Sequence, residues 1–169
     1  MNEEFVNLKD QQVLYEIKDY LENVQIASTL LEASEEIPFN ILVAVTGEQA
    51  SVNIMYVPIP EDHFEDIRLI QLYALIIRTI DESRKNDLLM LLNELNNRCA
   101  VGTFFINEQL ELGFKYIFPI NRFELPKESS FIQTFTLYLN SLLSLIDLTV
   151  QVNNGSLALE EALKLLNSE

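Results

Sequence analysis

The sequence has little of what catalytic and metal sites are usually built from. Its 169 residues include one Cys, one His, four Gly and no Trp. A single Cys excludes an internal disulfide, and together with a single His it excludes a zinc site rich in these two residues. Four scattered Gly leave no glycine-rich phosphate loop, and no Ser lies in a Gly-x-Ser-x-Gly motif. The sequence therefore predicts a protein that is not an enzyme and that holds no metal and no cofactor.

Basic residues are also scarce. Lys and Arg number 11 against 26 Asp and Glu, which gives a formal net charge of −15. A surface of this charge repels phosphate backbones and anionic lipids. Only Arg84 and Lys85 are adjacent basic residues, so the sequence shows no basic patch. We therefore expect neither a nucleic-acid partner nor a membrane partner.

Signals for export or membrane insertion are lacking as well. Residues 1–4 read Met-Asn-Glu-Glu, without the positive and apolar regions of a signal peptide. The longest apolar stretch is shorter than the roughly 20 residues that a membrane span needs. We expect a cytoplasmic protein.

Apolar residues are abundant, at 49% of the chain against 22% charged residues. This balance is typical of a globular protein, because a disordered chain has fewer Leu, Ile, Val and Phe residues. No Gly-, Ser- or Pro-rich linker separates the chain into parts. We predict one domain over residues 1–169.

Hydrophobic periodicity predicts both helices and strands. Apolar residues recur every three or four positions in four predicted helices, at 8–23, after Asp81 or Ser83 up to about 98, at 128–152, and at 156–167 with Ser156 as its cap. Apolar residues alternate in the predicted strands at 24–32, 39–45, 52–56, 67–77, 101–106 and 110–120. Strands joined by short turns predict an α+β fold of two layers, with helices packed on an antiparallel sheet.

An acidic loop around His63 is the best candidate for chemistry. Glu61, Asp62, Glu65 and Asp66 surround this single His, and such side chains can bind a divalent cation or a small ligand. The loop lacks the alternating oxygen ligands and the Gly of a calcium loop, which favours a solvated acidic loop. A metal- or small-ligand-binding protein, or an enzyme using this loop, is therefore the alternative function.

Cys99 follows the C-terminal end of a predicted helix. A reactive thiolate is favoured at a helix N-terminus or beside cations, so this position favours a small buried residue instead.

The helix predicted at 128–152 has more apolar surface than one sheet can cover. A helix on a sheet needs an apolar stripe roughly 100° wide, and here Phe, Tyr and Leu extend well beyond that. The excess contacts either the last helix or a partner, and the pattern leaves both open. If it contacts a partner, the expected binding residues are Phe131, Phe135, Tyr138, Leu142 and Leu145. Leu91 and Leu95 are expected to support them from the core.

Residues 67–120 resemble the YbjN family, a group of bacterial proteins whose domain is similar in fold to type III secretion chaperones. The segments that carry the resemblance are 68–74 (RLIQLYA), 91–98 (LLNELNNR), 102–105 (GTFF), the polar turn at 107–109, and 111–116 (ELGFKY) with Pro119 after it. The resemblance implies a type III secretion chaperone-like α+β domain without enzyme activity, with dimerisation as one option. The helix at 156–167 is an addition to that domain.

These observations favour a non-enzymatic protein-binding module, either chaperone-like or a regulatory adaptor. Its partner would be a protein client or a second copy of the chain, bound through apolar sheet and helix surface. The acidic surface favours basic clients.

Overall fold

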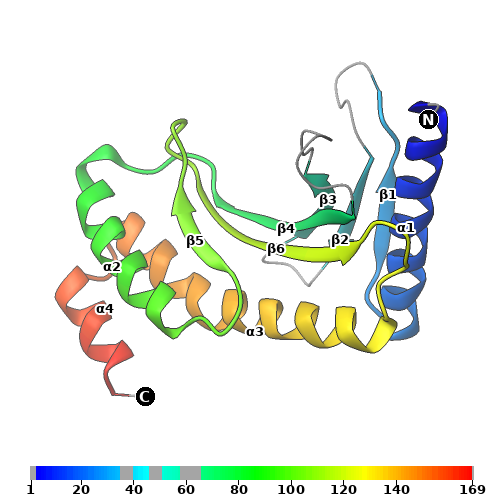
Figure 1. Ribbon diagram of the computed structural model, residues 1–169. Helices are drawn as coiled ribbons and strands as arrows, with labels where there is room; N and C mark the ends of the chain where they lie inside the picture. Colours follow the sequence, from blue (N-terminus) through cyan, green and yellow to red (C-terminus); the bar gives the residue numbers. More distant parts are fainter. Residues whose placement is uncertain (1–2, 35–39, 46–50, 58–65, 169) are drawn as a thin grey trace. The chain divides into compact units, whose positions relative to one another are not determined.

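The computed structural model describes residues 3–34, 40–45, 51–57 and 66–168. Its elements in chain order are α1 (Glu3–Asn23), β1 (Ser28–Leu31), β2 (Ile41–Val45), β3 (Ser51–Val57), β4 (Ile67–Ile77), a 3-10 turn (Glu82–Arg84), α2 (Lys85–Arg98), β5 (Thr103–Ile106), β6 (Leu112–Asn121), α3 (Glu128–Asn153) and α4 (Leu159–Leu166). The strands form a six-stranded sheet in the order β1-β2-β3-β4-β6-β5 (Figure 1). This antiparallel sheet with four helices confirms the predicted α+β class.

The chain divides into two compact units. The first contains residues 1–74 and 117–135, and the second contains residues 75–116 and 136–169. The strands β4 and β6 and the helix α3 each contribute residues to both units. That residues 1–169 form a single domain stays a prediction.

In the first unit, α1 lies against β1, β2 and β3 (Figure 1). Most of its predicted apolar stripe is buried, with Val13 at 5% exposure and Ile17 and Leu21 fully covered, whereas Val24, the last residue of that stripe, is exposed. Alternate strand residues are buried, because successive side chains of a strand point to opposite faces of the sheet. These buried strand residues are Leu42, Ala44, Val52, Ile54, Ile70 and Leu72.

The strand predicted at 67–77 is found at those bounds as β4. It pairs antiparallel with β3, with Ile54 opposite Leu72. The turn expected between the strands predicted at 39–45 and 52–56 lies outside the described residues, but the strands on either side of it, β2 and β3, pair antiparallel as expected.

In the second unit, α2 follows a turn that Asp81 caps. The Asp81 carboxylate accepts hydrogen bonds from the backbone N–H and the hydroxyl of Ser83. These bonds stabilise the charged carboxylate and lower the pKa of Asp81. The apolar face of α2 is buried as predicted, through Leu88, Leu91, Leu92 and Leu95.

The last helix begins later than predicted, and Ser156 does not cap it. α4 starts after Ala158, which makes no side-chain capping bond. The backbone N–H of Ser156 instead donates to the side-chain oxygen of Asn154, in the turn that ends α3. Ser and Asn stabilise such turns as readily as helix starts, so the sequence pattern suits either role.

Gly102 lies directly before β5 in a backbone conformation with φ of +92°. A Cβ atom at this position would lie 2.3 Å from the ring of Phe114. Only glycine fits, because it tolerates positive φ and leaves room for the aromatic ring.

Candidate protein-binding surface

Four of the five predicted binding residues on α3 lie in the core. Phe131, Phe135, Tyr138 and Leu142 are at most 1% exposed. Leu145 is half-buried. The covered side chains are not accessible to a partner in this structure, because the chain itself buries them. The side of α3 that a partner could reach is the one opposite to these four buried residues.

Tyr138 shows what these residues do instead. Its ring lies 4.9 Å from the ring of Phe114, which in turn lies 4.4 Å from that of Phe104. The Tyr138 hydroxyl donates a hydrogen bond of 2.9 Å to the backbone oxygen of Phe114. Ring packing and this hydrogen bond therefore hold α3 against β6 within the second unit. Leu91 and Leu95, expected as core support, are also fully buried.

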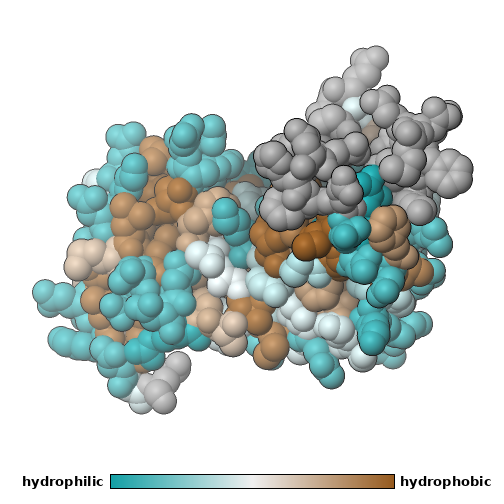
Figure 2. All heavy atoms as spheres, in the orientation of Figure 1, coloured by the Kyte–Doolittle hydropathy of each residue, from teal (hydrophilic) through white to brown (hydrophobic). Residues whose placement is uncertain are grey.

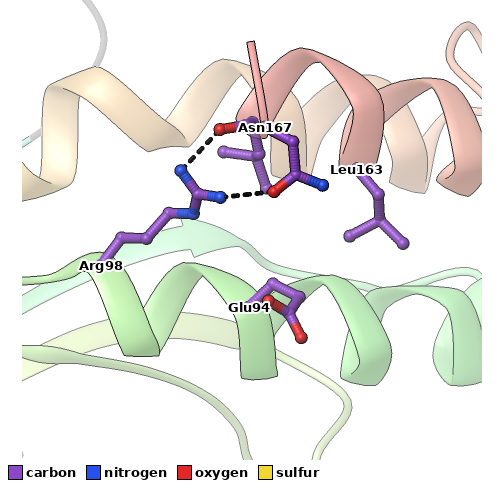
Figure 3. A pocket seen from close by; sticks show the side chains of 5 residues that line it. Glu94, Arg98, Leu163 and Asn167 are labelled. Carbon is purple, nitrogen blue, oxygen red and sulfur yellow. Dashed lines mark hydrogen bonds between the residues drawn. The ribbon is translucent and has the colours of Figure 1, made fainter. Parts of the chain in front are cut away.

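In the second unit, α2 and α4 lie side by side (Figure 1). Arg98, at the end of α2, donates hydrogen bonds to the backbone oxygen of Leu166 and, at 2.8 Å, to the side-chain oxygen of Asn167 (Figure 3). The last carbonyl groups of a helix lack partners within the helix and carry partial negative charge, so a cation is favourable there. Arg98 thereby fixes the C-terminal end of α4 to α2.

A hollow of about 260 Å³ remains between these two helices. Glu94 and Arg98 line it from α2, and Leu163, Leu166 and Asn167 from the other side (Figure 3). Its volume is below the roughly 300–1,000 Å³ of typical small-molecule pockets.

Large apolar side chains are exposed on the same two helices. On α2, Leu89 is 46% and Met90 59% exposed, and on α4 Leu165 is 51% exposed. Figure 2 shows apolar side chains gathered among hydrophilic ones over α2. Sequence analysis missed this set, here called the α2–α4 surface. One sequence feature could have identified two of its members. Leu89 and Met90 lie outside the buried stripe of α2, which consists of residues 88, 91, 92 and 95.

The edge of the sheet beside α2 is closed by a side chain. β5 is the last strand of the sheet. Asn96 of α2 accepts a 2.7 Å hydrogen bond from the backbone N–H of Phe104 and donates one of 3.0 Å to its carbonyl. The amide thus occupies the backbone groups that a further strand would use. Binding at β5 by strand addition is blocked at this residue.

Among the residues that the structure describes, no group of three or more His, Cys, Asp and Glu side chains could hold a metal ion. The loop with His63 lies outside the described residues. Burial raises the pKa of the Cys99 thiol, which favours the unreactive protonated form.

Within the described part of the chain, α3 is the one helix that is long and apolar enough to cross a membrane. The sequence analysis expected no stretch of that length. A core helix of a globular protein meets the same criterion, so length and composition are weak grounds for a span. In this structure one side of α3, through Phe131, Tyr138 and Leu142, is buried.

The fold is that of type III secretion chaperone-like structures, as the resemblance implies. The chain is similar to the crystal structure of the ExsC-ExsE complex, with 15% identity and a TM-score of 0.52 over 83% of this chain and 95% of that chain. It is also similar to YbjN from E. coli (11% identity, TM-score 0.48, 79% of this chain and 87% of that one).

A third similar structure is a protein from Methanothermobacter thermautotrophicus, with 14% identity and a TM-score of 0.49 over 83% of this chain and 99% of that one. No protein-family model matches the chain, and no curated protein matches it. At these identities the likeness concerns the fold alone.

Proposed function

We propose that the chain is a non-enzymatic module that binds a partner protein through the α2–α4 surface. The observation that carries the proposal is the exposure of Leu89, Met90 and Leu165 on the two helices that also line the hollow at Arg98. Large exposed apolar side chains are typical of protein-binding sites. A similar fold occurs in ExsC-ExsE, a complex of two proteins, which supports the proposal.

The proposed partner presents apolar side chains among basic ones. The apolar side chains cover Leu89 and Met90. The net charge of −15 attracts a basic partner and accelerates its association at low salt. The module acts in the cytoplasm, as a chaperone or a regulatory adaptor.

The residues that sequence analysis assigned to binding act indirectly in this proposal. Phe131, Phe135, Tyr138 and Leu142 hold α3 in the core, and Leu145 is the member with accessible surface. The exposed residues of α2 and α4 make the contacts. The proposed binding mode is a helix or an irregular peptide on helices, since Asn96 blocks strand addition at Phe104.

The test is a comparison of two variants that add the same charge at sites of equal exposure. Leu89 on α2 and Tyr15 on α1 are both 46% exposed. Proteins retained from host lysate by the wild type are identified, purified and titrated in a calorimeter. We expect Leu89→Glu to weaken binding by about tenfold or more, because a carboxylate would be desolvated in the contact, and Tyr15→Glu to leave the affinity unchanged.

Two results would contradict the proposal. One is that no purified candidate binds the wild-type protein in the calorimeter. The other is that both variants bind a purified partner as tightly as the wild type does.

A further inference from the structure

The turn between α3 and α4 contains the one Asn-Gly sequence of the chain, at Asn154 and Gly155. Both residues are exposed. Asparagine is chemically labile in proteins. In an Asn-Gly sequence the backbone nitrogen that follows the asparagine can attack the side-chain amide carbon, because glycine has no Cβ atom to hinder the approach. The folded turn decides whether these two groups can meet.

The side chain of Asn154 is folded over the peptide bond that joins this residue to Gly155. Its oxygen accepts a 2.9 Å hydrogen bond from the backbone N–H of Ser156. The ring closed by this bond contains both the amide carbon (Cγ) of Asn154 and the nitrogen of Gly155, so one tight turn already holds the two atoms. The same bond draws electron density from the amide carbon, which favours attack there.

The surroundings of Gly155 are open and positively charged. The three heavy atoms nearest to a Cβ atom placed at this residue all belong to the guanidinium group of Arg84, at 3.0, 3.6 and 3.8 Å. A cation at this place stabilises the negative charge on a backbone nitrogen that has lost its proton. The hydrogen bond from the Gly155 N–H to the carbonyl oxygen of Val152 is 3.2 Å long, at the weak end of the usual range.

We propose that Asn154 is a site of spontaneous deamidation through a cyclic imide. The nitrogen of Gly155 loses its proton to water or hydroxide and forms a bond to Cγ of Asn154, and the side-chain nitrogen leaves as ammonia. Water then adds to one of the two carbonyl carbons of the ring and breaks the bond from that carbon to the ring nitrogen. Opening at Cγ leaves aspartate. Opening at the backbone carbon leaves isoaspartate, in which the main chain runs through the former side chain.

Asn121 shows which part of this arrangement is special. It is exposed like Asn154, and its side-chain oxygen also accepts a 2.9 Å hydrogen bond from the backbone N–H two residues later, that of Phe123. The residue between them is Arg122, whose Cβ atom hinders attack by its nitrogen. The N–H of Arg122 also donates a 2.8 Å hydrogen bond to the backbone oxygen of Asp66. Asn121 therefore has the side-chain bond and the exposure without the glycine, and it serves as an internal control.

The products change the turn that leads into α4. In the imide the nitrogen of Gly155 carries no hydrogen, so its bond to Val152 is lost. In isoaspartate the main chain is longer by a carbon atom, and the side-chain oxygen that accepted the bond from Ser156 belongs to the main chain. α4 has eight residues and depends on its contacts for stability. Deamidation therefore loosens the start of α4, while Arg98 still holds its C-terminal end. The proposal does not depend on partner binding at the α2–α4 surface.

Peptide mapping by mass spectrometry tests the modification in the folded, purified chain. The protein is incubated at mildly alkaline pH, and amide loss is followed at each asparagine. We expect Asn154 to lose its amide about tenfold or more faster than Asn121 and Asn153, because neither of these precedes a glycine. Isoaspartyl methyltransferase detects the isoaspartate expected among the products. We expect slower loss at mildly acidic pH, since the Gly155 nitrogen must lose its proton.

Two variants separate the site from the rest of the chain. Asn154→Gln keeps an amide but requires a larger ring for the attack, so we expect no amide loss at this position over the same incubation. Asn121→Gln is the matched control and should leave the loss at Asn154 unchanged. Circular dichroism verifies that both variants are folded.

Amide hydrogen exchange measures the effect on α4. We expect exchange of residues 159–166 to accelerate by about threefold or more in incubated wild-type protein compared with fresh protein. Asn154→Gln should show the same exchange before and after incubation.

Four results would overturn the proposal. The first is a folded chain in which Asn154 keeps its amide as long as Asn121 does. The second is amide loss that occurs only after unfolding in guanidinium chloride, since the folded turn would then protect the site. The third is the formation of aspartate without isoaspartate, which would indicate direct hydrolysis. The fourth is unchanged exchange of α4 in the deamidated chain.

Discussion

At the residue scale, two polar side chains of the helices form hydrogen bonds with backbone groups of the strands. Asn96 bonds both backbone groups of Phe104, and Tyr138 bonds the carbonyl of Phe114. Periodicity correctly predicted the burial of Leu91 and Leu95, because burial follows from the helix repeat alone. It could not predict the role of Asn96, because that role requires β5 to pack against α2.

Replacing Asn96 by Ala tests this role. Asn96→Ala removes two hydrogen bonds and leaves the backbone groups of Phe104 without these partners, which costs about 2 kcal/mol of unfolding free energy. Urea denaturation measures the change. Asn97→Ala, at the exposed neighbouring position of the same helix, is the control and should be close to neutral. Equal effects of the two variants would show that Asn96 does not close the edge.

At the element scale, alternation and helix periodicity located the strands and helices well. β4 has the predicted bounds, and α3 differs from its prediction by one residue at its C-terminal end. The binding role assigned to one of these faces stays a prediction. Hydrophobic periodicity identifies the side of a helix that the chain itself buries, so Phe131, Phe135 and Tyr138 were found as a stripe but lie in the core.

The attachment of α4 is an element-scale prediction. An isolated helix of eight residues is unstable in water, so α4 depends on its contacts with α2. Arg98→Ala removes the hydrogen bonds to Leu166 and Asn167. We expect amide exchange of residues 159–166 to accelerate by about tenfold or more, while exchange in β4 is unchanged. Lys164→Ala is the control on the exposed side of α4. Unchanged exchange in Arg98→Ala would mean that apolar contacts alone hold the helix.

At the scale of the whole molecule, the net negative charge disfavours association between chains, whereas the exposed apolar surface favours it. The chain carries −15 at neutral pH and exposes large apolar side chains on several elements. The order of strands and helices was enough to predict the fold class, since hairpin-connected strands and amphipathic helices allow few arrangements. The accessible binding surface required coordinates, because exposure depends on all elements together.

Solubility should depend on this charge. The sequence gives an isoelectric point near 4.3. Lowering the pH towards that value neutralises the carboxylates, and without repulsion the exposed apolar surfaces associate. We expect light scattering to rise to a maximum near pH 4.3 and to fall again at lower pH. A solution that stays clear throughout would show that charge does not limit association.

The close approach of Gly102 to Phe114 couples a position directly before β5 to a position on β6. The ring of Phe114 is held by Tyr138 and Phe104, so it has little freedom to move away from a new methyl group. A library randomised at both sites should therefore yield alanine at position 102 only in clones whose residue at position 114 is smaller. Such clones would still have a strained left-handed backbone conformation at position 102. This pair of residues therefore limits which substitutions the sequence can accept while the hairpin keeps its conformation.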